Sequence, residues 1–137
     1  MYIVVYDFGT SSVKTCLFEI DTEIRLVAGA TAGYGLYISD DGGAEQDTEE
    51  WWSALCKTTR ELFRISDVRP EEIEGMAFCS QMQGSVFVDE NGNAVKPPMT
   101  YLDQKGVKEY RDCMGSGIIK VSGCSLYKLV RNLIVNY

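Results

Sequence analysis

The order of the hydrophobic segments constrains the fold more than any other feature of this sequence. Residues 2–6, 13–20 and 24–32 are β-rich and separated only by short turns, which predicts three strands that pair as antiparallel neighbours. A long amphipathic helix follows, and then another apolar segment at residues 73–79. A strand that follows a helix is expected to lie parallel to the first strand. This order predicts an α/β fold with a ribonuclease-H-like mixed sheet, since a doubly wound parallel sheet needs a helix directly after its first strand.

The long helix has a well-marked start. Asp47 can cap its first turn, and Glu50 stands three residues later, as in a capping box. Apolar residues then recur at helical spacing, which predicts one face packed against the sheet. They are Trp51, Trp52, Leu55, Cys56, Thr59, Leu62 and Phe63. We expect both tryptophans in the core, a loop at residues 33–46, a central strand at 2–6 that is covered on both faces, and another buried strand at 73–79.

The rest of the chain is less regular. Residues 86–88 alternate in polarity and precede the sequence DENGN, which is typical of a hairpin turn. A weaker helix is expected from about 103 to 114, a short strand at 118–122, and a final helix with one apolar stripe. That stripe comprises Leu126, Leu129, Val130, Leu133 and Ile134. We expect residues 1–137 to form part of one domain, with a core at about 1–80, a substrate-side insertion at about 81–105 and a helical remainder at about 106–137.

Charge and residue content exclude several classes of function. The chain has 13 Lys+Arg and 20 Asp+Glu, a formal net charge of −7, so neither a nucleic acid nor a membrane is an expected partner. The absence of histidine excludes Ser-His-Asp triads and histidine-ligated metals. No apolar stretch has the length of a membrane span, and no signal peptide is evident. The cysteines Cys16, Cys56, Cys79, Cys113 and Cys124 are expected to be mostly buried, reduced thiols of a cytoplasmic protein.

The strongest local motif follows the first strand, at residues 7–14 (DFGTSSVK). A carboxylate ends a buried strand, a glycine allows a turn with positive φ, and hydroxyl groups and turn amides come next. Such groups can hold phosphate oxygens, and Asp7 can hold Mg²⁺ directly or through water. The candidate residues are Asp7, Gly9, Thr10, Ser11, Ser12 and Lys14. The alternative is a plain hairpin whose side chains satisfy its own turn amides.

Two further clusters could recognise a polyhydroxylated ligand. Gln81, Met82 and Gln83 follow the strand at 73–79, and amides can pair with hydroxyl groups as donors and acceptors. Tyr101 and Asp103 combine an aromatic face with a carboxylate. The alternatives are an exposed polar turn for the first cluster, and for the second a helix N-cap at Asp103 with the tyrosine packed beneath it.

These motifs, in this order, resemble the FGGY family of carbohydrate kinases, the group of xylulokinase and glycerol kinase, which has the actin/Hsp70/sugar-kinase fold. Residues 7–14 resemble the family's phosphate motif, and 45–52 resemble its Gln-Asp segment with a Trp-bearing helix. Residues 80–84 resemble the xylulokinase sequence GQMHG. Residues 89–92 and 101–105 resemble the family's D-x-x-G and W-x-D-x-R. The chain departs from these patterns at Gln83, Tyr101 and Lys105, where the family has His, Trp and Arg.

The resemblance implies an ATP- and Mg²⁺-dependent kinase that phosphorylates a hydroxyl of a ketose, pentulose or polyol. It implies phosphate and Mg²⁺ contacts at residues 7–14 and sugar contacts at Gln81, Met82, Gln83, Tyr101 and Asp103. Family members are much longer, and their general-base aspartate lies beyond residue 137, so we expect this chain alone to be inactive. Two alternatives stay open. They are another actin/Hsp70-superfamily ATPase, and a self-standing, non-enzymatic module that forms a homodimer through its C-terminal stripe.

Overall fold

The computed structural model describes residues 1–115, 120–121 and 124–125. The strands are β1 (Tyr2–Phe8), β2 (Ser12–Ile20), β3 (Ile24–Gly33), β4 (Tyr37–Ile38), β5 (Ala44–Glu45), β6 (Ile73–Ser80), β7 (Lys120–Val121) and β8 (Cys124–Ser125). The helices are α1 (Thr48–Ser66), the short 3₁₀ helix η1 (Pro70–Glu72) and α2 (Val107–Gly115). No helix in the described part of the chain is long and apolar enough to cross a membrane.

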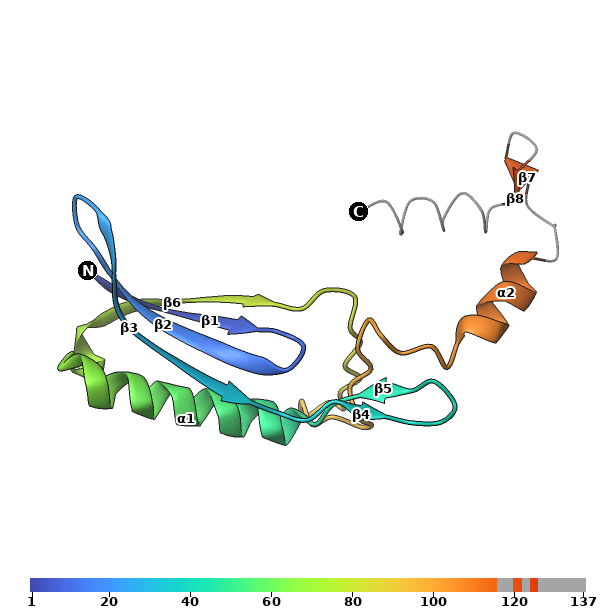
Figure 1. Ribbon diagram of the computed structural model, residues 1–137, viewed down its shortest axis with the longest axis horizontal. Helices are drawn as coiled ribbons and strands as arrows, with labels where there is room; N and C mark the ends of the chain where they lie inside the picture. Colours follow the sequence, from blue (N-terminus) through green and yellow to red (C-terminus); the bar gives the residue numbers. More distant parts are fainter. Residues whose placement is uncertain (116–119, 122–123, 126–137) are drawn as a thin grey trace.

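The main sheet has the strand order β3-β2-β1-β6 (Figure 1). β1 pairs antiparallel with β2, and β2 pairs antiparallel with β3. β6 returns after α1 and pairs parallel with β1, in the register that places Val5 beside Ala77 and Tyr6 beside Phe78. The predicted order of three antiparallel strands, a helix and a parallel strand is therefore confirmed, and so is the mixed α/β sheet.

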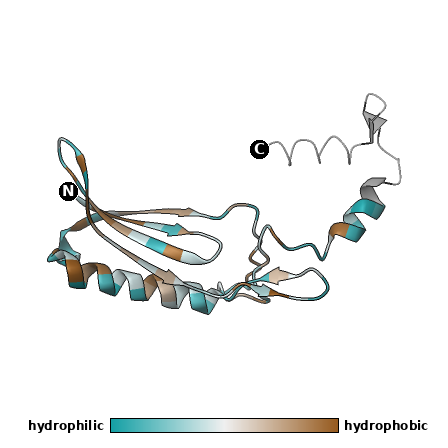
Figure 2. Cartoon of the chain, in the orientation of Figure 1, coloured by the Kyte–Doolittle hydropathy of each residue, from teal (hydrophilic) through white to brown (hydrophobic). Residues whose placement is uncertain are grey.

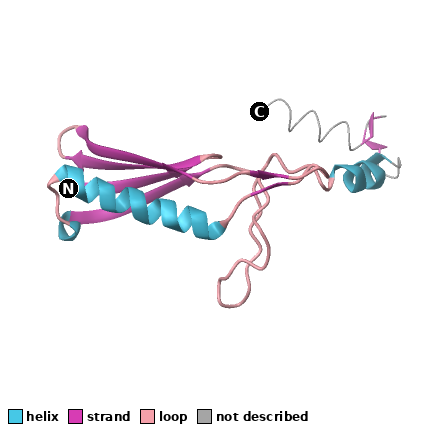
Figure 3. Ribbon diagram, turned by 60° about the horizontal axis from the view of Figure 1, so that its bottom comes forward, coloured by secondary structure: helices cyan, strands magenta, loops and turns pink. Residues whose placement is uncertain are grey.

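α1 lies along one face of this sheet (Figures 1 and 3). Its buried residues Ala54, Thr58 and Leu62 recur every four positions, so they form a narrow stripe. The facing core comes from alternate residues of β1, β2 and β3: Val4, Tyr6, Val13, Thr15, Leu17, Ala28 and Ala32. Two hydroxyl contacts tie the layers together, Thr15 to Thr58 at 2.7 Å and Tyr6 to Thr59 at 3.0 Å.

The opposite side of the sheet and its β6 edge are more exposed than the sequence predicted. β6 is an edge strand, and Met76 and Phe78 are exposed although Phe78 stacks on Tyr6. The prediction of a buried strand at 73–79 is wrong, because α1 does not reach this edge. The prediction of a core position for Trp52 is also wrong, since its side chain is 63% exposed. Trp52 lies two residues before the buried Ala54, which is a rotation of about 200° around the helix axis. Its side chain therefore points away from the sheet.

Two short hairpins lie beyond the sheet. The first, β4–β5, occupies part of the segment predicted as a loop and turns at residues 39–43, where Gly42 has φ +87°. Figure 2 shows that its tip is hydrophilic. The second is the predicted turn after residues 86–88, in which the Asp89 amide donates to Asn93 O and a bridge joins Val88 to Ala94. The predicted helix at 103–114 begins later, at Val107. The predicted apolar stripe from Leu126 to Ile134 lies outside the described residues.

Candidate functional site

Three strands place polar side chains in one row on the sheet face opposite α1. Asp7 is paired with Lys14 across the β1–β2 ladder and with Cys79 across the β1–β6 ladder. Lys14 Nζ lies 3.3 Å from Asp7 Oδ2, and Cys79 Sγ donates to Asp7 Oδ1 at 3.4 Å. The structure thus brings the candidate residues Asp7 and Lys14 together, and the row leaves a carboxylate and an ammonium group exposed to solvent at the end of β1.

Cys79 is exposed, which corrects the expectation of mostly buried cysteines, while Cys16 and Cys56 are half-buried. All three thiols are free. The hydrogen bond to the Asp7 carboxylate, followed by burial, raises the pKa of the Cys79 thiol above its ordinary value. The thiol therefore stays protonated and donates to Asp7.

Tyr34 stabilises the turn that joins β1 to β2 by hydrogen bonds to the backbone carbonyls of the turn. The Gly9 amide donates to Ser12 O at 3.0 Å and closes the turn. The Tyr34 hydroxyl lies within hydrogen-bond distance of both Gly9 O and Ser12 O, and the Tyr34 amide donates to Ser11 O at 3.2 Å. Burial, and then the charge of Asp7, raise the pKa of Tyr34, so its hydroxyl stays protonated as a donor.

The fourth carbonyl of the turn is also occupied. Gln46 Nε2 donates to Thr10 O at 2.7 Å. Within the part of the chain that the structure describes, the hydroxyls of Thr10, Ser11 and Ser12 make no hydrogen bond. The carbonyls of the turn are thus engaged by the protein, while its hydroxyl donors are left for another partner. An anion such as a phosphate group needs donors of this kind.

The expected role of Gly9 in this turn is not observed. Among the described glycines only Gly42 and Gly92 have positive φ, so the prediction of a left-handed backbone at Gly9 is wrong. The hydrogen bond from Gly9 N to Ser12 O closes the turn without it. A Cβ at Gly9 would lie 3.4 Å from Ser12 O, an ordinary contact, so the turn does not demand glycine on steric grounds.

The second predicted cluster follows β6 and lies against the first. The Gln81 backbone amide donates to Phe8 O at 2.7 Å, which extends the β1–β6 pairing by one step. Met82 is 77% exposed, and Gln83 has φ 63°. A non-glycine residue in the left-handed region stores strain, and such residues cluster at functional sites. A Cβ at Gly84 would lie only 3.2 Å from Met99 O, so this glycine permits the close approach of the next segment.

The third predicted cluster is joined to β5. Asp103 accepts hydrogen bonds from the amides of Ala44 at 3.0 Å and Lys105 at 3.1 Å, while Tyr101 is half exposed. Burial alone would raise the pKa of Asp103, but these amides and the Lys105 charge hold it below its ordinary value. The alternative in which Asp103 caps the following helix is wrong, because α2 begins at Val107. Lys105 also forms an ion pair with Glu45.

The predicted capping box at the start of α1 is only half present. The Asp47 side chain accepts from the Glu49 amide at 2.8 Å, as a cap does. Glu50 does not return to Asp47 but accepts from the Gly35 amide at 2.6 Å and the Tyr37 hydroxyl at 2.5 Å. The Tyr37 bond, and then the Gly35 bond, lower the pKa of Glu50.

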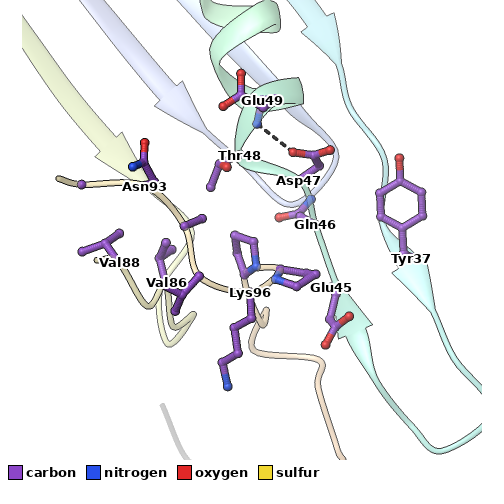
Figure 4. A pocket seen from close by; sticks show the side chains of 15 residues that line it. Tyr37, Glu45, Gln46, Asp47, Thr48, Glu49, Val86, Val88, Asn93 and Lys96 are labelled. Carbon is purple, nitrogen blue, oxygen red and sulfur yellow. Dashed lines mark hydrogen bonds between the residues drawn. The ribbon is translucent and has the colours of Figure 1, made fainter. Parts of the chain in front are cut away.

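A cavity of about 710 Å³ is lined by residues 45–49 on one side and by Val86, Val88 and residues 92–98 on the other (Figure 4). Figure 4 shows acidic side chains of Glu45, Asp47 and Glu49 on one wall and Val86 and Val88 on the other. Gln46 lines this cavity with its neighbours and also donates a hydrogen bond to Thr10 O in the β1–β2 turn. None of the sequence-predicted site residues lines this cavity.

Comparison with known proteins decides the family. Residues 2–131 match the N-terminal domain of the FGGY family of carbohydrate kinases. This chain belongs to that family. A gluconokinase of Bacillus subtilis is 34% identical over 105 residues, and a xylulose kinase of the same organism is 29% identical over 104 residues. Each match covers 76% of this chain but only 20% of the relative. This FGGY-family chain therefore spans about one fifth of the length of these relatives.

Solved structures of the family share the fold. A gluconate kinase from Lactobacillus acidophilus superposes with a TM-score of 0.74 at 23% identity, covering 85% of this chain and 23% of that one. A glycerol kinase from Plasmodium falciparum, solved with ADP, gives a TM-score of 0.68 at 14% identity, covering 98% and 29%. The mixed sheet thus matches the N-terminal part of the actin-like sugar-kinase fold.

Proposed function

We propose that this chain is the N-terminal portion of an ATP-dependent carbohydrate kinase. The protein would transfer the ATP γ-phosphoryl group to a hydroxyl of a ketose, pentulose or polyol, in the cytoplasm. The observation that carries the proposal is the β1–β2 turn. Its carbonyls accept hydrogen bonds from Tyr34 and Gln46, whereas no hydrogen bond among the described residues engages its hydroxyls, and it directly follows Asp7, whose carboxylate lies 3.3 Å from Lys14 Nζ.

The residues of this turn suit a nucleotide phosphate with Mg²⁺. Asp7 offers a hard oxygen ligand, and Mg²⁺ is often held by one or two carboxylates together with waters and substrate phosphates. The described residues contain no cluster of three metal-ligating side chains. When bound, Mg²⁺ would neutralise phosphate charge. The hydroxyls of Thr10, Ser11 and Ser12 would donate to phosphate oxygens, and Lys14 would balance the remaining charge.

The sugar would lie beyond the ends of β1 and β6. The Gln81 backbone amide donates to Phe8 O, next to the proposed phosphate turn. Met82 and Gln83 follow Gln81 directly and would contact the phosphoryl acceptor there. Tyr101 and Asp103 would complete this side in the substrate-side insertion, at about residues 81–105. Because the carboxylate of Asp103 already accepts two backbone hydrogen bonds, it would contact a sugar hydroxyl through its remaining lone pairs.

Phosphoryl transfer depends on positioning and charge stabilisation, and the residues described here supply only one side of such a site. We therefore propose that the 137-residue chain by itself does not turn over sugar. The test is a coupled assay of ADP release by the complete gene product with D-xylulose, gluconate and glycerol. The expected result is ADP release that depends on one of these compounds, and none by residues 1–137 alone. A rate of ATP hydrolysis that does not change on addition of any sugar or polyol would contradict the kinase assignment and favour an ATPase of the same superfamily.

A further inference from the structure

Gln46 is a buried amide that the sequence analysis did not place in the site. It lies between β5 and the start of α1, and only 1% of it is exposed. Its Nε2 donates to Thr10 O at 2.7 Å and to Gly35 O at 3.1 Å, and its Oε1 accepts from Gln81 Nε2 at 2.6 Å. One side chain thus connects the predicted phosphate turn with the first residue of the predicted sugar cluster.

The connection at Gln81 depends on Gln46. Gln81 Oε1 is buried and has no hydrogen-bond partner among the described residues, so the bond from Nε2 to Gln46 is the single hydrogen bond of this side chain. An amide with a buried, unpaired oxygen tolerates little displacement, because losing the hydrogen bond of its nitrogen leaves the group without a protein partner. The position of Gln81 is therefore coupled to that of Gln46.

The third cluster reaches the same short segment through the backbone. The Gln46 backbone amide donates to Pro98 O at 3.0 Å. Two residues earlier, the Ala44 backbone amide donates to the Asp103 carboxylate, and the Ala44 carbonyl accepts from the Thr100 amide at 2.9 Å. All three clusters predicted from the sequence are thus anchored on residues 44–46. Gln46 is the member of this segment that contacts two of them through its side chain.

We propose that Gln46 is a positioning residue that fixes the distance between the phosphate turn and the turn at Gln81. It touches neither phosphate nor sugar but sets how the group that donates the phosphoryl and the hydroxyl that accepts it are aligned. The kinetic consequence rests on the proposed function, whereas the mechanical coupling between the two turns does not. The alternative is that Gln46 only adds stability, as any buried hydrogen-bonded side chain does.

Hydrogen exchange tests the mechanical coupling without any activity. The variants are Gln46→Met, Gln81→Met and the double variant, in the complete protein. We expect Gln81→Met to raise the rate of amide hydrogen exchange about tenfold at residues 79–85, around the substitution itself. The same increase is expected at residues 8–12 and 33–36, because Gln46 connects Gln81 to these segments. The double variant should exchange no faster than Gln46→Met alone. Exchange changes confined to residues 79–85 in Gln81→Met, or effects that add in the double variant, would overturn the proposal.

Kinetics test the positioning role, with Thr58→Val as the matched control. Thr58 is 1% exposed and its hydroxyl contacts Thr15 in the core, away from both turns. We expect Gln46→Met to lower kcat for sugar phosphorylation about 10- to 100-fold, and to lower ATP hydrolysis in the absence of sugar by a smaller factor. Thr58→Val should lower the melting temperature similarly but keep the ratio of the two rates. An unchanged ratio in Gln46→Met would overturn the positioning role.

These outcomes separate the two proposals. A wild-type protein that phosphorylates no sugar refutes the proposed function, and the exchange experiment then still decides whether Gln46 couples the two turns. A wild-type kinase in which the exchange effects stay local refutes the coupling and leaves the proposed function standing.

Discussion

Leu17 provides the sharpest test of the layer that supports the site. It lies in β2, it is fully buried with 0% exposure, and it packs in the core between the sheet and α1. Truncating a buried leucine to alanine removes its transfer free energy and leaves a cavity, at a cost of about 2–5 kcal/mol. A domain of this size has a free energy of unfolding of about 5–15 kcal/mol, so Leu17→Ala is expected to remove a large share of it.

The assay is urea unfolding of the chain, followed by far-UV circular dichroism and tryptophan fluorescence. With an m-value of about 2 kcal/mol/M, a loss of about 3 kcal/mol lowers the midpoint by about 1.5 M. Leu26→Ala is the matched control, because Leu26 is also a strand leucine but is 56% exposed. We expect the control to cost about 1 kcal/mol or less, the range of strand propensity effects.

Equal midpoints for Leu17→Ala and Leu26→Ala, with unchanged m-values, would refute this reasoning. That result would mean that α1 does not cover the β2 face of the sheet. The hydroxyl contact between Thr15 and Thr58 would then also be absent in solution.

Two further predictions concern the segments around the β1–β2 turn. Tyr34→Phe removes the hydroxyl that reaches Gly9 O and Ser12 O, so we expect a loss of about 1 kcal/mol in urea unfolding and faster hydrogen exchange at residues 9–12; an unchanged exchange pattern would contradict it. The pKa of Glu50 is lowered by the Tyr37 and Gly35 hydrogen bonds, so its stabilisation is complete above the unfolded value of 4.5 and is lost as the pH falls through the lower folded value. Melting temperatures should therefore fall less steeply below pH 4.5 in Glu50→Gln than in wild type, and identical slopes would refute this.

The main sheet was predictable because its pattern is local. A continuous apolar run defines β1 and a β-rich segment defines β2, and the short turns between the first three strands favour antiparallel pairing. The helix position followed from Asp47 and the apolar spacing after it. The burial of each face was not predictable, because it depends on where α1 sits across the sheet. Trp52 and Phe78 are apolar residues in regular elements, yet both are exposed.

The sequence indicated candidate residues for the site but not the hydrogen bonds that connect them. The motif at residues 7–14 indicated a phosphate turn, and the structure places Asp7 beside Lys14. Gln46 was missed because a lone glutamine has no periodicity and no spacing rule. The resemblance of residues 45–52 to the family's Gln-Asp segment includes Gln46, but that resemblance says nothing about the contacts of its side chain. Only the fold brings its side chain between Thr10 and Gln81.

The most direct test of the central claim is sugar-dependent ADP release by the complete protein and by its Asp7→Asn variant. This substitution keeps the size of the side chain and removes the charge that would face Mg²⁺ and phosphate. We predict that turnover falls by orders of magnitude while sugar binding, measured by calorimetry without ATP, changes little. Unchanged turnover in Asp7→Asn would contradict the assignment of residues 7–14 to the phosphate site.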